Sequence, residues 1–179
     1  MSDPIELERI FLKHDLNDFR WVKPTEISIG HWVRFKCTWG CPNFNVRANC
    51  PPNTPTVELC RKFFDEFSLA AIFRFTKSVS NEEERLKWIN DVNKALLALE
   101  RSVFLSGYYK VFALYADACR ICQDCAGTRE KCKDKMSSRP TASSLAVDVF
   151  QTARKAGFPM SVLTDPSQTM NHYGFILIE

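Results

Sequence analysis

The sequence predicts an α+β or α/β fold, with a mixed sheet of four to five strands, helices mainly on one face and two cysteine-rich loops. First, strand-like segments alternate with amphipathic helical segments along the chain. Second, the 179 residues are 45% hydrophobic and 25% charged, as in ordinary globular proteins. Third, two dense groups of cysteines each follow a strand-like segment. We therefore expect one cysteine-rich metal-binding domain over residues 1–179.

Short apolar runs and period-two alternation identify the strands. The predicted strands are 19–22, 26–29, 32–36, 69–75, 108–115, 158–163 and 173–178. In the third of them, Val33 and Phe35 alternate with polar residues and lead to Cys37 on the same face. We therefore expect this strand to deliver the first cysteine at its end.

Apolar residues at helical spacing, together with capping residues, identify three helices. They run from Thr54 along an apolar stripe that includes Cys60, from Ser80 to Gly107, and from Pro140 to Gly157. Ser80 with Glu83 three residues later has the pattern of a capping box. Both cysteine loops would then leave the carboxyl ends of strands, where open α/β sheets usually keep their sites.

Eight cysteines are the unusual feature of the composition. The N-terminal residues lack a basic segment followed by an apolar run, so we expect a cytoplasmic protein. Disulfides are rare there, and a cysteine-rich domain is more often metal-binding or catalytic. The balance of 24 basic to 21 acidic residues gives a net charge of +3, too small to indicate nucleic acid or a membrane as partner.

The second group of cysteines has the spacing C-x2-C-x2-C-x6-C and consists of Cys119, Cys122, Cys125 and Cys132. Three cysteines at successive spacings of three can wrap one face of an iron–sulfur cubane, because each thiolate takes a different iron. A zinc ion is more often held by two separate pairs of cysteines. The spacing therefore favours an iron–sulfur cluster, with zinc as the alternative.

The first group has the spacing C-x3-C-x8-C-P-P and consists of Cys37, Cys41 and Cys50. Cysteine followed by proline recurs at the cluster sites of bacterial ferredoxins. A fourth ligand is not evident. The candidates are Cys60, which fits equally well as a core residue on its helix, His31, a residue of a partner protein, or an open iron position.

These motifs resemble those of an uncharacterised family of predicted cysteine-rich metal-binding proteins of bacteria and archaea, a domain of unknown function. The resemblance extends from about Cys37 to Gly157. It rests on three segments, Gly40-Cys41-Pro42-Asn43 with Cys50-Pro51-Pro52-Asn53-Thr54-Pro55, Cys119 to Ala126 with Cys132, and Arg139-Pro140-Thr141 with Asp148-Val149-Phe150. It implies metal binding by the seven cysteines other than Cys60, and no particular reaction.

The chain departs from the family pattern in two places. Phe44-Asn45 stands where an aromatic residue followed by glycine is usual, and asparagine can adopt the same left-handed backbone. Thr141-Ala142-Ser143 follows Arg139-Pro140 where the family usually has serine, methionine and glutamate. The resemblance therefore does not extend any role of that glutamate to this chain.

Six basic residues surround the second group: Arg120, Arg129, Lys131, Lys133, Lys135 and Arg139. They are either a solvated loop or a docking surface for an acidic redox partner. No catalytic triad, paired carboxylate site, phosphate loop or dinucleotide fingerprint is visible, so no catalytic residue is predicted.

The sequence thus favours a protein with two cysteine-ligated sites, both 4Fe-4S, that acts as an electron-transfer module or as a redox accessory subunit of a larger enzyme. A different class is an enzyme or cluster-assembly factor in which the N-terminal cluster is incompletely ligated. A third hypothesis is a zinc-stabilised interaction module.

Overall fold

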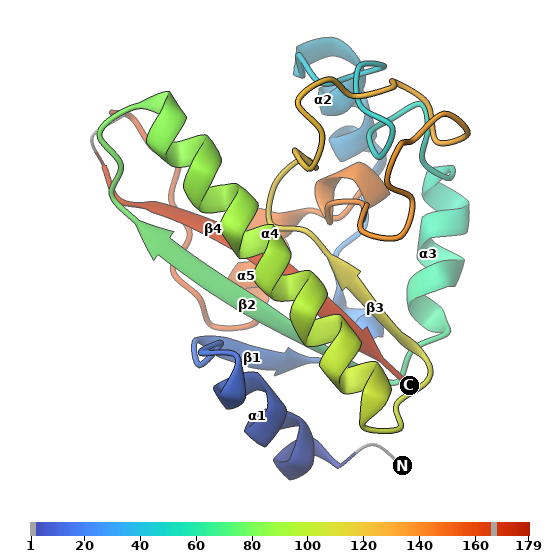
Figure 1. The fold of residues 1–179 in the computed structure, drawn as a ribbon, viewed down its shortest axis with the longest axis vertical. Helices are drawn as coiled ribbons and strands as arrows, with labels where there is room; N and C mark the ends of the chain where they lie inside the picture. The colour runs from blue at the N-terminus through green and yellow to red at the C-terminus, as the bar shows by residue number, and fades with distance from the viewer. Residues whose placement is uncertain (1–2, 166–167) are drawn as a thin grey trace.

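A computed structural model describes residues 3–165 and 168–179. Its centre is a four-stranded sheet in the order β1-β2-β4-β3, so the predicted α+β class is confirmed (Figure 1). The strands are β1 (Phe19–Val22), β2 (Leu69–Lys77), β3 (Val111–Leu114) and β4 (Met170–Ile178).

The prediction of a mixed sheet is wrong, because all three strand pairs are antiparallel. The helix α4 (Glu82–Leu105) connects β2 to β3, and these two strands do run in the same direction. The C-terminal strand β4 lies between them and pairs with both. Sequence order alone could not show that the last strand would be inserted there.

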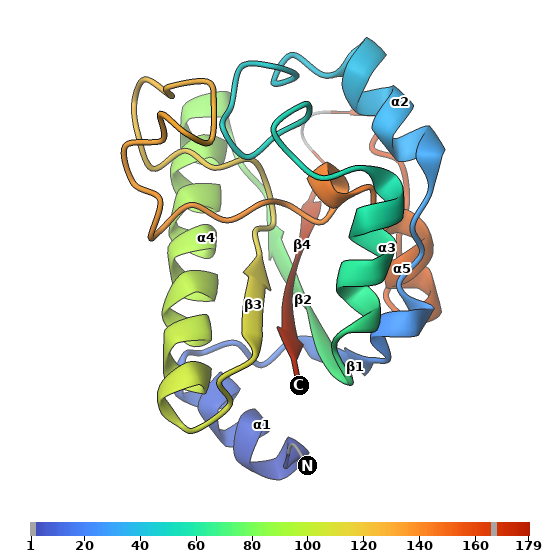
Figure 2. The same cartoon turned by 90° about the vertical axis from the view of Figure 1, so that its right-hand side faces the viewer.

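The helices cover both faces of the sheet, so the expectation of helices mainly on one face is also wrong (Figure 2). The helices α1 (Pro4–Lys13) and α4 pack on one face, and α3 (Val57–Asp65) and α5 (Val149–Lys155) pack on the other. The reason is visible in β4, where Phe175 and Leu177 belong to one core and Ile176 and Ile178 to the other. A strand with apolar residues on both faces requires cover on both.

The predicted strand 32–36 is instead part of the helix α2 (His31–Gly40). The alternation of Val33 and Phe35 misled the prediction, because only Val33 is buried and Phe35 is 63% exposed. The guanidinium of Arg34 donates hydrogen bonds to the carbonyl oxygens of Pro55 and Ser144, which hold this helix against its neighbours.

The bounds of other strands and helices differ from the predicted ones for local reasons. The predicted strand 26–29 is reduced to the short helix η1 (Pro24–Glu26) and one bridge from Ile29 to Val147, and 158–163 forms no strand. The predicted helix 140–157 is split into η2 (Ser143–Leu145) and α5, because Ala146 has a left-handed backbone with φ of 63°. Among the described residues, no helix is long and apolar enough to cross a membrane.

Two helix caps lie two residues and one residue beyond the predicted ones. Thr56, not Thr54, caps α3, and its hydroxyl accepts a hydrogen bond from the amide of Leu59. Asn81, not Ser80, caps α4, and its side chain accepts from the amide of Glu84 at 2.9 Å. The carboxylate of Glu84 in turn accepts from the amide of Ser80, the residue before the cap, which makes a variant of the capping box one residue later than predicted.

Candidate metal centres

The two cysteine-rich loops lie side by side beyond the end of β3 (Figures 1 and 2). We call residues 41–56 the first cysteine loop and residues 115–142 the second cysteine loop. Arg47 of the first donates to the carbonyl oxygen of Cys119 at 3.1 Å, and Asn53 donates to that of Gly127 at 2.8 Å. The side chain of Asn49 donates to the carbonyl of Arg139. The loops therefore form one hydrogen-bonded unit.

The four cysteines of the second group line one small cavity of about 20 Å³. They are Cys119, Cys122, Cys125 and Cys132. Burial raises the pKa of Cys119, and the neighbouring Cys125 and Cys132 act in the same direction. The first cysteine loop closes this cavity from the other side, since Arg47, Ala48 and Asn49 also line it. The amide of Ala48 donates a hydrogen bond to Sγ of Cys125 at 3.3 Å.

The three cysteines of the first group line a second cavity of about 140 Å³. Cys37 comes from the last turn of α2, Cys41 directly follows that helix, and Cys50 lies in the first cysteine loop. Burial, followed by the proximity of Cys41 and Cys37, raises the pKa of the Cys50 thiol to about 12. Burial also raises the pKa of Cys37. A metal bound here would have to displace these protons, since thiolates are the ligating form.

Soft sulfur donors of this kind fit an iron–sulfur cluster or zinc. Among the described residues, no three Cys, His, Asp or Glu side chains are grouped closely enough to hold a single metal ion. The two sets of cysteines are gathered around cavities, not around one point. The chemical type and the spacing of the cysteine ligands are therefore the features that indicate the metal.

A comparison with known protein families bears on these centres. The sequence profile described as "Predicted metal-binding protein (DUF2284)" matches residues 20–178. The chain belongs to the DUF2284 family. This confirms the resemblance found in the sequence and extends it to nearly the whole chain. No curated protein and no solved structure matches it.

Two of the proposed fourth ligands of the first centre lie elsewhere in this DUF2284 protein. Cys60 is only 1% exposed, belongs to the core between the sheet and α3, and directs its thiol to the carbonyl oxygen of Pro55 at 3.7 Å. His31 is exposed, and its Nε2 lies 3.2 Å from a carboxylate oxygen of Glu58. Neither side chain lines the cavity of the three cysteines.

A carboxylate that the sequence analysis passed over does line that cavity. Asp117 lies in the second cysteine loop, two residues before Cys119, and raises the pKa of Cys50 by its charge. Its carboxylate accepts hydrogen bonds from Arg85 at 3.0 Å and from the amide of Ala118 at 2.6 Å. The sequence did contain a signal for this residue, since it is an aspartate between the end of a strand and a cysteine motif. Asp117 therefore lies next to the first centre of this DUF2284 protein, and its carboxylate is already hydrogen-bonded to Arg85 and Ala118.

The basic residues of the second cysteine loop divide into two sets. Lys131, Lys133 and Lys135 are exposed on either side of Cys132. Arg139 instead lies mostly buried against the carboxylate of Glu100, with Nε to Oε2 at 2.9 Å. The three lysines and Arg129, which is also exposed, are therefore accessible to a partner of this DUF2284 protein, whereas Arg139 is held by Glu100.

Proposed function

We propose that the protein is an iron–sulfur protein with two 4Fe-4S clusters that acts as an electron-transfer module or as a redox accessory of a larger enzyme. Cys119, Cys122, Cys125 and Cys132 would ligate one cluster, and Cys37, Cys41 and Cys50 the other. When bound, such clusters supply one-electron transfer. The support is the metal-binding family, the ligand spacing and the grouping of each cysteine set around its own cavity.

The observation that best supports electron transfer is the short connection between the two centres. Ala48 donates its amide hydrogen to Sγ of Cys125, and Cys50, two residues later, lines the other cavity. All three residues from Ala48 to Cys50 are buried. The segment thus joins the two sets of ligands by one hydrogen bond and two residues of main chain. Such N–H donors to sulfur also stabilise the reduced state of a cluster and so raise its potential.

The exposed lysines favour a protein redox partner. Lys131, Lys133 and Lys135 lie around one ligand of the four-cysteine centre, and positive charge there would steer an acidic surface toward it. Changing the three lysines together to Glu should slow electron exchange with acceptors such as ferredoxin or flavodoxin at low salt and leave the iron content unchanged. Rates that respond to neither salt nor charge reversal would reject this docking role.

A second candidate function is an enzyme or cluster-assembly factor. The specific observation in its favour is that Cys37 and Cys41 also line a much larger cavity beside the first centre. With three cysteine ligands, one iron of that cluster would keep an open coordination position that a small molecule could occupy. A zinc-stabilised interaction module is the third hypothesis, and it predicts a protein without visible absorption.

The test of the two-cluster proposal is iron and sulfide analysis of anaerobically purified protein, with visible absorption and EPR after reduction by dithionite. Replacing Cys119, Cys122 or Cys125 by Ala should remove about half the iron, because each change affects only one of two equal clusters. Cys60→Ala is the matched control and should keep all the iron. A colourless protein with zinc, or unchanged iron in all three variants, would overturn the proposal.

A further inference from the structure

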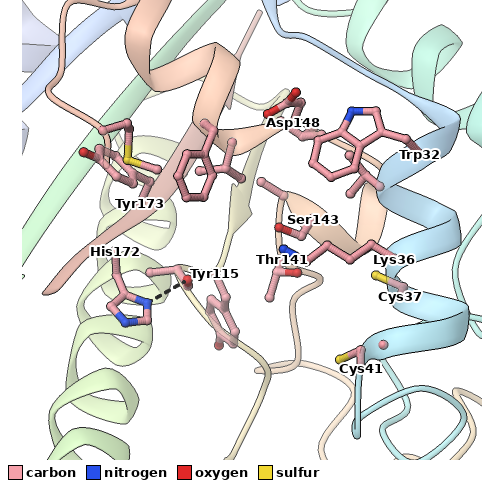
Figure 3. A pocket seen from close by; sticks show the side chains of 18 of the residues that line it. Trp32, Lys36, Cys37, Cys41, Tyr115, Thr141, Ser143, Asp148, His172 and Tyr173 are labelled. Atoms are coloured by element: carbon pink, nitrogen blue, oxygen red, sulfur yellow. Dashed lines mark hydrogen bonds between the residues drawn. The ribbon is translucent and has the colours of Figure 1, made fainter. Parts of the chain in front are cut away.

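A cavity of about 380 Å³ adjoins the three-cysteine centre. It lies between α2, α5 and β4, and Cys37 and Cys41 form part of its wall (Figure 3). Small-molecule sites have volumes of roughly 300–1,000 Å³ and mostly apolar walls with a few polar groups. This cavity has that size.

The walls are largely aromatic and aliphatic. Tyr115, Val147, Phe150 and Met160 line it, and Trp32 lies at one side. Tyr115 and Val147 are almost completely buried and form a fixed part of the wall, whereas Trp32 is 54% exposed and Phe150 and Met160 are partly exposed. A ligand with an apolar body would gain free energy by removing these exposed side chains and itself from water.

One cation points into this apolar space. Figure 3 shows the side chain of Lys36 reaching across the cavity toward Thr141 and Ser143. Among the described residues, no carboxylate forms an ion pair with Lys36. The acid in the wall, Asp148, already accepts the amide hydrogen of Gln151 at the start of α5 at 2.9 Å.

The other polar groups in the wall are already engaged or uncharged. His172 lies at the end of the cavity away from α2, and burial lowers the pKa of its imidazole, which is therefore neutral at pH 7. The hydroxyl of Tyr173 donates to the carbonyl oxygen of Pro159 at 3.1 Å. Lys36 is thus the cationic group of the cavity that a ligand can neutralise.

We propose that this cavity binds a small organic carboxylate, with its apolar body against Trp32 and Phe150 and its carboxylate on Lys36. A single ammonium group matches one carboxylate, whereas phosphate sites usually add helix amides or arginines. Because Cys37 follows Lys36 directly, the bound carboxylate would lie beside the metal of the first centre. That last step rests on the proposed function.

The experiment is equilibrium dialysis of the intact metal-loaded protein with phenylacetate, 3-phenylpropionate and 4-methylpentanoate, and with their neutral amides. We expect saturable binding of at least one carboxylate and weaker binding of its amide. Lys36→Met should weaken binding about tenfold or more, since it removes the charge and keeps the apolar stem. Lys36→Arg should retain binding. Lys94→Met, an exposed lysine on α4, is the matched control and should bind as the unmodified protein does.

A second variant tests the cavity and keeps the positive charge of Lys36. Ser143→Phe adds a ring to the wall that Lys36 faces and should weaken binding as well. Absence of saturable binding of all three carboxylates, or equal binding by Lys36→Met and the unmodified protein, would overturn the inference.

Iron analysis and EPR of the same samples separate the two proposals. A change in the EPR spectrum on binding shows that the carboxylate reaches the cluster. Lysine-dependent binding to a protein without iron would support the cavity and refute the iron–sulfur proposal. Two intact clusters in a protein that binds none of the carboxylates would support the iron–sulfur proposal and refute the cavity proposal.

Discussion

Replacing Arg139 by Met is expected to destabilise the protein by about 3 kcal/mol or more, because it leaves a buried carboxylate without its partner. Nε of Arg139 lies 2.9 and 3.1 Å from the two carboxylate oxygens of Glu100. The Glu100 side chain is 9% exposed and that of Arg139 is 20% exposed. Glu100 also accepts the amide hydrogen of Ala113 in β3, so the carboxylate cannot turn toward water without losing that bond.

The magnitude follows from this geometry. Removing one partner of a buried pair usually costs ~3–5 kcal/mol. The partial exposure of Arg139 favours the lower end of that range, and its lost hydrogen bonds to the carbonyls of Met136 and Ser138 add to it. With a denaturant slope of about 2 kcal/mol/M, the urea midpoint should fall by roughly 1.5 M.

The effect should also reach the metal centres. The carbonyl of Arg139 accepts a hydrogen bond from Asn49, which lines the four-cysteine cavity. We therefore expect faster loss of iron to a chelator in Arg139→Met than in the unmodified protein.

The assay is urea unfolding followed by circular dichroism, on samples matched for iron content. Glu100→Gln added to Arg139→Met removes the unpaired charge and keeps an acceptor for Ala113, so it should recover at least about half of the lost stability. Arg101→Met, on an exposed neighbour in α4, should change stability by less than about 0.5 kcal/mol. A loss below about 1 kcal/mol in Arg139→Met, or no recovery in the double variant, would refute this reasoning.

Three further predictions concern the core and the cavity wall. Cys60→Ala should keep all the iron and cost about 1 kcal/mol or somewhat more in urea unfolding, and loss of the N-terminal cluster would instead identify Cys60 as its ligand. Gly174→Ala should lower the melting temperature, because its Cβ would overlap Cδ1 of the fully buried Leu96, and Leu96→Ala should therefore cost less stability in the Gly174→Ala protein than in the unmodified one. Because burial lowers the pKa of His172, the unfolded chain takes up a proton that the folded one does not, so stability should fall as the pH drops below about 6.5. His172→Gln should flatten that fall, and parallel stability curves from pH 7.5 to 5.5 would contradict it.

The cysteine motifs and the long helix could be predicted from sequence because their signals are local. The spacing of Cys119, Cys122 and Cys125 by itself restricts the ligands to one short loop, and these thiols do line one cavity with Cys132. The apolar period of α4 and its capping residues predicted that helix to within a few residues at each end. Such features depend on neighbours in the chain, which the sequence contains directly.

The surroundings of the first centre could not be predicted in this way. The alternation of Val33 and Phe35 fits a strand as well as a helix that exposes an aromatic residue, and only contacts of Arg34 with distant carbonyls decide between them. Cys60 was equally compatible with core and ligand until the packing of α3 placed it in the core.

Residue identity and spacing along the chain show which thiols are available and which of them belong to one loop. The tertiary structure decided that the two cysteine loops share hydrogen bonds, that Asp117 lies beside Cys50, and that Lys36 faces a cavity formed from α2, the second cysteine loop and β4. Segments far apart in the chain meet there because β4 inserts between β2 and β3 and both faces of the sheet must be covered. Contacts of that kind depend on the packing of the whole chain, which no local pattern of residues records.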